Sequence, residues 1–269
     1  SVAINYYLNE MVSLGVDYCF MEVSSHGIHQ KRTEGLQFVG GVFTNLTHDH
    51  LDYHKTFAEY RDVKKLFFDR LPKSAFALIN IDDKNGPVMF QNTEAKKQSY
   101  ALKTMADFKA KILEKQFSGT LITINGTEVW TKLIGEFNVY NLLAIAATAE
   151  LLGLEKIKTL TILSQLESVS GRFQYVVSSN GVIAIVDYAH TPDALAKALT
   201  ALRPLATQRG GKVWCVFGCG GDRDSGKRPQ MGQVAQEYAD HIVLTSDNPR
   251  SEEPEAIIAM IRSGITKEL

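Results

Sequence analysis

Short apolar runs alternate with helical segments along the first part of the chain, and this alternation limits the fold more than any other feature. The apolar runs lie at 16–23, 38–46 and 76–82, and the helical segment 2–14 before them is stopped by Gly15. Continuous apolar runs of this kind are typical of parallel strands that helices cover on both faces. The sequence therefore predicts an α/β fold built on a mostly parallel sheet.

A different kind of β structure is expected between residues 109 and 134. Two segments of alternating polarity there flank Asn125-Gly126-Thr127, which is a strong hairpin signal. A long helix, FNVYNLLAIAATAELLG, follows over 137–153 and ends at Gly153. These features add a small antiparallel part to the predicted sheet.

A domain boundary is predicted near Ser170-Gly171, which divides the chain into residues 1–170 and 171–269. The second part opens with a hairpin whose turn is SSNG. Its first helix is expected at Thr191-Pro192-Asp193, where a capping residue, a proline and an acid stand in their favoured places.

The rest of the second part returns to the alternation of strands and helices. The runs KVWCVFG and HIVLTSD flank a helix expected near 228–239, and a last helix is expected to begin around Ser251. This order predicts a Rossmann-like domain with an open sheet that is cut short.

Composition excludes several classes of protein. The apolar fraction of 45% and the charged fraction of 22% are those of a globular chain. The net charge of -1 gives no broad basic field for nucleic acid or a membrane surface, and no apolar run approaches about 18 residues. Cys19, Cys215 and Cys219 lie on or beside apolar runs, so we expect buried, reduced thiols in a cytosolic protein.

The segment GCGGDRDSGKRP, residues 218–229, comes close to a phosphate-binding loop but lacks its last element. Such a loop ends in Ser or Thr, whose hydroxyl holds magnesium. Arg228 occupies that position here and cannot bind a cation. We therefore interpret this loop as a site for some other ligand.

Polar clusters fall where strands are expected to end, which is where open parallel sheets bind ligands. Glu22 interrupts an apolar strand end, which an edge glutamate followed by a helix cap would also explain. The segment THDHLDYH packs several acids and histidines into a few residues, and either metal chemistry or a solvated loop would explain it. These acids and histidines are His48, Asp49, His50, Asp52 and His54.

A lysine stands among apolar residues in the helical segment TFAEYRDVKKLFFDRL. Lys64 falls on the same helical stripe as Phe57, Tyr60 and Phe67, whereas its neighbour Lys65 does not. A buried lysine is costly unless its charge is paired or removed, so Lys64 is either a functional residue or a solvated one at the edge of the stripe.

Eight segments in this order resemble the Mur ligase family, and they span almost the whole chain. Each is weak alone, but their common order is specific. The segments are MEVSSHG (21–27), TNLTHDHLDYH (44–54), the helix with Lys64, GEFNVYN (135–141), SGR (170–172), DYAHTPDAL (187–195), FGCGGDRDSGKRP (217–229) and DNPR (247–250).

The resemblance implies an ATP-dependent amide ligase of peptidoglycan precursor synthesis. The expected reaction adds meso-diaminopimelate to UDP-N-acetylmuramoyl-L-alanyl-D-glutamate through an acyl phosphate. The expected cofactors are ATP and Mg²⁺ at two sites. The resemblance further implies a cytoplasmic monomer that binds neither nucleic acid nor membranes, with a central ATP-binding domain followed by an amino-acid-binding domain.

The resemblance also assigns roles residue by residue. The catalytic residues and magnesium ligands are Glu22, His50 and Lys64, the last as a carbamylated lysine whose added carbon dioxide supplies an anionic oxygen. The nucleotide contacts are Asn138 and Asn141 at adenine, Arg172 at phosphate and Asp187 at ribose. The contacts to the uridine-linked peptide are Ser24, Gln30 and Arg32. The contacts to the incoming amino acid are Arg223, Asp247, Asn248, Pro249 and Arg250. His190 fits either the ATP site or a helix cap.

The chain departs from the family pattern because it contains no GTNGKT-like phosphate loop. We therefore expect a fragment that lacks this loop, the uridine-binding domain and the end of the last domain, and that is inactive by itself. Three alternatives remain open. They are a folylpolyglutamate-synthetase-like ligase, a metallo-β-lactamase-like hydrolase built on residues 48–54, and a binding module without catalysis.

Overall fold

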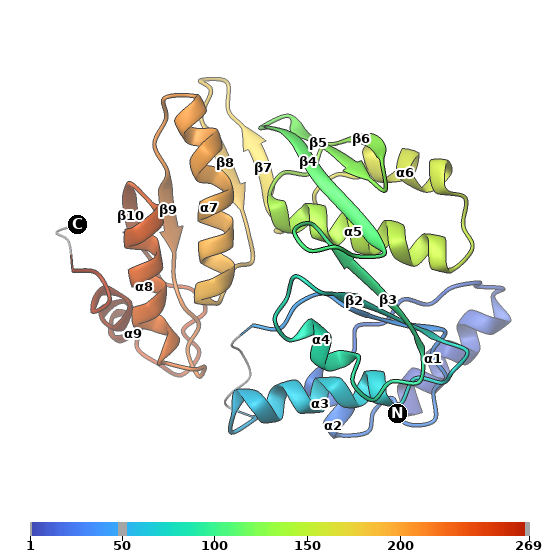
Figure 1. Ribbon diagram of the computed structural model, residues 1–269. Helices are drawn as coiled ribbons and strands as arrows, with labels where there is room; N and C mark the ends of the chain where they lie inside the picture. The colour runs from blue at the N-terminus through green and yellow to red at the C-terminus, as the bar shows by residue number, and fades with distance from the viewer. Residues whose placement is uncertain (1, 48–52, 267–269) are drawn as a thin grey trace. The chain divides into compact units, whose positions relative to one another are not determined.

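The computed structural model describes residues 2–47 and 53–266, and the chain divides into two compact units (Figure 1). Ser1–Leu46 and Tyr53–Ser99 form the first unit, and Tyr100–Leu269 forms most of the second. The elements of the first unit are α1 (Val2–Ser13), α2 (Ser25–His29), β1 (Gly40–Phe43), α3 (Phe57–Asp69), β2 (Phe76–Asn80), α4 (Gly86–Met89) and most of β3 (Lys96–Ala101). The elements of the second are β4 (Phe108–Gln116), β5 (Gly119–Ile124), β6 (Thr127–Thr131), α5 (Glu136–Leu151), α6 (Lys156–Gln165), β7 (Gln174–Val177), β8 (Ile183–Val186), α7 (Pro192–Gln208), β9 (Trp214–Phe217), α8 (Lys227–Tyr238), β10 (His241–Leu244) and α9 (Pro254–Arg262).

The predicted mixed α/β fold is confirmed by a six-stranded sheet with the order β1-β2-β3-β4-β5-β6. The pairs β1–β2 and β3–β4 are parallel, whereas β4, β5 and β6 form an antiparallel meander. Asn125 and Gly126 turn the chain between β5 and β6 with φ of 45° and 82°. Asn-Gly is the favoured pair where both turn residues need a positive φ, and the predicted hairpin is confirmed.

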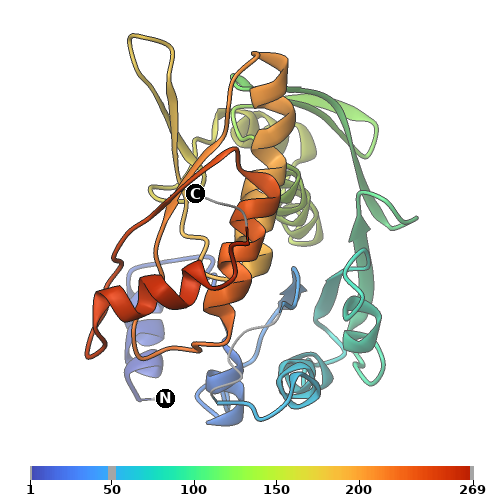
Figure 2. The ribbon, with the colours of Figure 1, turned by 90° about the vertical axis from the view of Figure 1, so that its left-hand side faces the viewer.

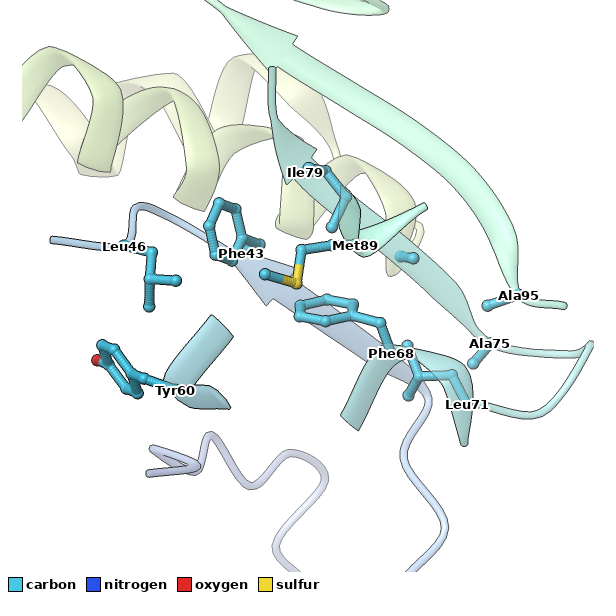
Figure 3. Packing of buried hydrophobic residues seen from close by; sticks show 10 residues of the cluster. Phe43, Leu46, Tyr60, Phe68, Leu71, Ala75, Ile79, Met89 and Ala95 are labelled. Atoms are coloured by element: carbon cyan, nitrogen blue, oxygen red, sulfur yellow. The ribbon is translucent and has the colours of Figure 1, made fainter. Parts of the chain in front are cut away.

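The core of the first unit lies between β2 and helix α3 (Figure 3). Every residue of β2 is buried, which explains why this strand reads as a continuous apolar run. Phe43, Phe68, Ile79 and Met89 meet in this core, and Tyr60 and Leu46 close one end of it (Figure 3). Helix α3 is thereby fixed against the sheet, and with it the orientation of its polar side chains.

The second unit ends in a βαβ arrangement that confirms the predicted alternation. Strands β9 and β10 are parallel and helix α8 connects them. Helices α7 and α8 pack against each other (Figure 2). Helix α7 begins as predicted, because the Thr191 side chain accepts a hydrogen bond from the backbone N–H of Ala194 at 3.2 Å. The β7–β8 hairpin also forms, as a separate two-stranded sheet.

Three sequence-based expectations are wrong. Residues 16–23 form no strand, and Phe20 is 77% exposed, because no described segment pairs with this run and a strand requires a partner. Cys19 on the same run is exposed, while Cys215 and Cys219 are buried as expected. Helix α9 begins at Pro254 rather than around Ser251, because Ser251 and Glu252 lie in a loop where their side chains bond to Asp222 and Arg228.

None of the helices formed by residues 2–47 and 53–266 is long and apolar enough to cross a membrane.

Candidate functional site

Lys64 on α3 and Glu22 before α2 are brought together in the first unit. The Nζ atom of Lys64 donates a hydrogen bond to the Val23 carbonyl at 3.0 Å. Burial lowers the pKa of Lys64, and the nearby Glu22 carboxylate partly opposes this shift. Two of the three predicted metal ligands are therefore neighbours, whereas His50 lies outside the described residues.

The expected difference between Lys64 and Lys65 is wrong. Lys65 is the more buried of the two, with 7% of its surface exposed, and Lys64 is only half-buried. The Lys65 ammonium is paired with the Asp69 carboxylate one turn later at 2.6 Å, which compensates its burial. Lys64 instead has a backbone carbonyl and a nearby carboxylate, and its pKa is the one that falls.

No group of three His, Cys, Asp or Glu side chains within residues 2–47 and 53–266 is placed to hold a metal ion. The predicted set contains His50, which lies outside the described residues, and a modified lysine. His54, from the same polar segment, is fully buried, and its Nε2 lies 2.8 Å from the Ser25 hydroxyl. His54 thus links α2 to the segment before α3.

The three residues predicted to contact the peptide substrate lie at the two ends of α2. Ser24 caps the helix by accepting a hydrogen bond from the Gly27 N–H at 3.1 Å. Gln30 follows the last turn, and both Gln30 and Arg32 have exposed side chains. Tyr53 was not singled out from the sequence, yet its hydroxyl lies 2.8 Å from His29 Nδ1 and 3.4 Å from the Gln30 amide nitrogen.

Asn138 and Asn141 stand on consecutive turns at the start of α5. The Asn138 amide donates to the Ile134 carbonyl at 2.9 Å and is half-buried. The Asn141 amide lies 3.4 Å from the Asn138 side-chain oxygen and is exposed. The neighbouring rings of Phe137 and Phe173 meet edge to face at 5.1 Å, which brings this helix start beside the segment of Arg172.

Arg172 and Asp187 are both exposed and both already have partners. The Arg172 guanidinium lies 4.2 Å above the ring of Tyr188. The Asp187 carboxylate accepts hydrogen bonds from the backbone N–H groups of Phe173 and Ala189 at 2.8 and 2.9 Å. Both side chains are thus held by residues that flank the β7–β8 hairpin.

Of the two roles expected for His190, capping of α7 is wrong. Thr191 caps that helix, and the Nδ1 atom of His190 lies 3.0 Å from the Tyr188 carbonyl.

The loop that follows β9 and the loop that follows β10 are joined closely. The Gly221 N–H donates to the Asn248 carbonyl at 3.1 Å, and the Arg250 guanidinium donates to the Gly221 carbonyl. A Cβ atom on Gly221 would lie 1.8 Å from the Pro249 carbonyl oxygen, so only glycine allows this approach. GDRD and DNPR therefore form one surface, on which Arg223 and Asp247 are exposed.

A buried arginine that sequence reasoning did not assign supports this surface. Arg228 is fully buried, and its guanidinium binds both oxygens of the Glu252 carboxylate at 2.7 Å. The same guanidinium donates to the Gly220 carbonyl at 3.2 Å. Two features of the sequence pointed to it: Arg228 replaces the Ser or Thr of a phosphate-binding loop, and it is a cation in the first turn of α8, where the helix dipole disfavours it.

Comparison with known proteins places both parts of the chain in one family. Residues 1–149 match the Mur ligase middle domain, and residues 171–268 match the Mur ligase glutamate ligase domain. The chain belongs to the Mur ligase family. The resemblance inferred from the eight segments is thereby confirmed.

Individual Mur ligases are similar over nearly the whole chain. A UDP-N-acetylmuramoyl-L-alanyl-D-glutamate--2,6-diaminopimelate ligase of Cytophaga hutchinsonii is 52% identical over 98% of this chain and 54% of its own length. One of the same name from Parabacteroides distasonis is 54% identical over 96% of this chain and 53% of its own length. A solved structure with that name is 38% identical, with a TM-score of 0.61 over 90% of this chain and 50% of its own. The chain thus spans about half the length of these Mur ligases.

Proposed function

We propose that the full-length Mur ligase containing this chain adds meso-diaminopimelate to UDP-N-acetylmuramoyl-L-alanyl-D-glutamate, with ATP as the energy source. The observation that carries this proposal is the identity of 50% or more, over nearly the whole chain, with several relatives that bear this name. The joined loops after β9 and β10 support it, because they present several polar side chains on one surface. The corresponding enzyme class is EC 6.3.2.13.

The proposed reaction has two steps. A carboxylate oxygen of the D-glutamate residue attacks the γ-phosphorus of ATP, the bond to ADP breaks, and an acyl phosphate forms. The amine of diaminopimelate then attacks the acyl carbon, loses a proton, and phosphate leaves. Because three anionic partners must meet, positioning and charge neutralisation supply most of the catalysis.

Arg250 is the proposed recognition group for the far carboxylate of diaminopimelate. Arginine is always charged and presents a planar fork that matches a carboxylate. In the structure the Arg250 guanidinium has one backbone partner, Gly221, and its side chain is exposed, so donors remain for a ligand. Arg223, Asp247, Asn248 and Pro249 complete the proposed amino-acid site.

Lys64 is proposed to be carbamylated and to hold magnesium together with Glu22 and His50. Its surroundings fit this role, because only a neutral amine adds carbon dioxide and burial lowers the pKa of Lys64. When bound, magnesium would neutralise charge that develops on the transferred phosphoryl group. Lys64 itself is held at the Val23 carbonyl, beside the Glu22 carboxylate that would share the ion.

The remaining assignments follow the same proposal. Ser24, Gln30 and Arg32 would contact the uridine-linked peptide, and Gln30 and Arg32 have the exposed side chains that this needs. Asn138, Asn141, Arg172 and Asp187 would contact ATP. We also propose that the enzyme is a cytoplasmic monomer.

The test uses full-length enzyme, magnesium-ATP, the nucleotide dipeptide, and either diaminopimelate or lysine. Lysine lacks the far carboxylate, so we expect the native enzyme to favour diaminopimelate by roughly 10⁴-fold in kcat/KM. Arg250→Ala should remove most of this preference, whereas Arg262→Ala on the exposed face of α9 should keep it. Equal use of the two amino acids by the native enzyme would refute the proposal.

A further inference from the structure

We propose that the buried Arg228–Glu252 ion pair is a positioning device that sets the selectivity of the amino-acid site. The inference rests on the proposed function, because it concerns how Arg250 is held for diaminopimelate. Neither residue of the pair is assigned a contact with substrate. Both act through the loops after β9 and β10.

Stability alone explains the Arg228–Glu252 pair poorly. Arg228 has no exposed surface and lies in the first turn of α8, where the helix dipole opposes a cation. At a buried position, apolar residues of similar volume commonly stabilise the fold at least as well as an ion pair does. A guanidinium, however, fixes directions, because its two nitrogens meet the two Glu252 oxygens at 2.7 Å each.

Glu252 transmits this geometry to the loop after β9. Its Oε1 atom also accepts a hydrogen bond from the Asp222 N–H at 2.6 Å. The Asp222 carboxylate in turn accepts a hydrogen bond from the Ser251 hydroxyl at 2.5 Å. Arg228, Glu252, Asp222 and Ser251 thus form one connected network that includes the two residues directly after Arg250.

The backbone beside this network has a conformation that needs support. Asp222, Asn248 and Arg250 have φ values of 51°, 44° and 52°. Asn and Asp adopt this left-handed region more readily than other non-glycine residues, whereas a long side chain such as that of Arg250 keeps it only where its surroundings hold it. The network and the Gly221–Asn248 hydrogen bond supply such support, and they direct the Arg250 side chain toward the Gly221 carbonyl.

The consequence is a separation of roles. Arg250 would bind the far carboxylate, while Arg228 and Glu252 would hold the backbone from which Arg250 projects. Weakening the Arg228–Glu252 pair should displace Arg250 and leave nucleotide binding unchanged. A displacement of about 1 Å in a positioned group lowers the rate on the order of 10²-fold.

The experiment compares three variants of the full-length enzyme. Glu252→Gln keeps the shape and removes the charge, and the double variant Arg228→Met with Glu252→Met replaces the pair by apolar groups. Glu255→Gln is the matched control, since this exposed glutamate lies in the first turn of α9. The measurements are KM for diaminopimelate, KM for ATP, the ratio of kcat/KM for diaminopimelate and lysine, and the melting temperature.

We expect Glu252→Gln to raise KM for diaminopimelate and to lower kcat/KM for it on the order of 10²-fold, with KM for ATP nearly unchanged. The double Met variant should keep a melting temperature close to that of the native enzyme and still lose selectivity. A double variant that keeps native selectivity would show a purely structural role and overturn the inference, as would a Glu252→Gln variant with an unchanged KM for diaminopimelate. A native enzyme that does not use diaminopimelate would instead overturn the proposed function, and the inference with it.

Discussion

Adding a single methyl group at Gly221 should separate the two loops of the amino-acid site. The Cβ atom of alanine would lie 1.8 Å from the Pro249 carbonyl oxygen and 2.6 Å from the carbonyl carbon. Ordinary contact begins at 3.4 Å, so the loops must part by about 1.6 Å, the difference between 3.4 and 1.8 Å. No rotation of a side chain relieves this clash, since both contacts are with backbone.

The energetic consequence has two parts. Overpacking of this kind costs about 1–3 kcal/mol. The shift also breaks the hydrogen bond from the Gly221 N–H to the Asn248 carbonyl, which is 3.1 Å long, and this loss adds about 1 kcal/mol. We therefore expect Gly221→Ala to lower the free energy of unfolding by roughly 2–4 kcal/mol.

The same loop offers a matched control. Gly226 has φ of -64°, which alanine adopts easily, and its Cβ would lie 3.2 Å from an oxygen of the Asp224 carboxylate, which is the end of a side chain rather than backbone. Gly226→Ala should change stability by less than about 0.5 kcal/mol. The assay is urea unfolding of the full-length enzyme, together with KM for diaminopimelate. Equal stability of the two variants, or a Gly221→Ala enzyme with native KM, would refute the reasoning.

Three further outcomes are expected. Lys64→Ala in the full-length enzyme should nearly abolish activity. Added short carboxylates should partly restore this activity, because they can occupy the place of the carbamate oxygens. An unmodified Lys64 in the mass spectrum, together with a fully active alanine variant, would exclude this role. Hydrogen bonding to Arg228 holds the pKa of Glu252 at about 2, below its usual 4.5, so the stability that Glu252 contributes is complete above pH 4.5 and is lost as the pH falls through about 2. Glu252→Gln should flatten the acid-unfolding curve in that window, and an unaltered curve would count against the ion pair. Burial raises the pKa of Cys215 to about 11, so at pH 8 iodoacetamide should modify the exposed Cys19 first and reach Cys215 and Cys219 only after unfolding, as peptide mass mapping would show.

Local signals in the sequence were sufficient for much of the fold. The β5–β6 hairpin follows from Asn125-Gly126, and the start of α7 follows from Thr191. Such features depend on residues a few positions apart, which the sequence displays directly. The order of eight segments was likewise enough to place the chain in the Mur ligase family.

Features that depend on distant partners were not predictable in this way. Residues 16–23 have the composition of a strand but no paired neighbour among the described residues, and composition carries no information about pairing. The burial of Lys65 rather than Lys64 depended on how α3 is rotated against β2 and on the partner that Asp69 supplies. A stripe drawn from helical periodicity fixes that rotation only approximately.

For the candidate site, too, local features could be read from the sequence and long-range contacts could not. The sequence by itself determined which side chains are present in GDRD and DNPR, and thereby the chemistry that the loops can perform. Only the tertiary structure decided that Gly221 lies against Pro249 and that the buried Arg228 binds the Glu252 carboxylate. These contacts join residues more than twenty positions apart, and they form because two parallel strands, β9 and β10, end side by side and release their loops at the same edge of the sheet.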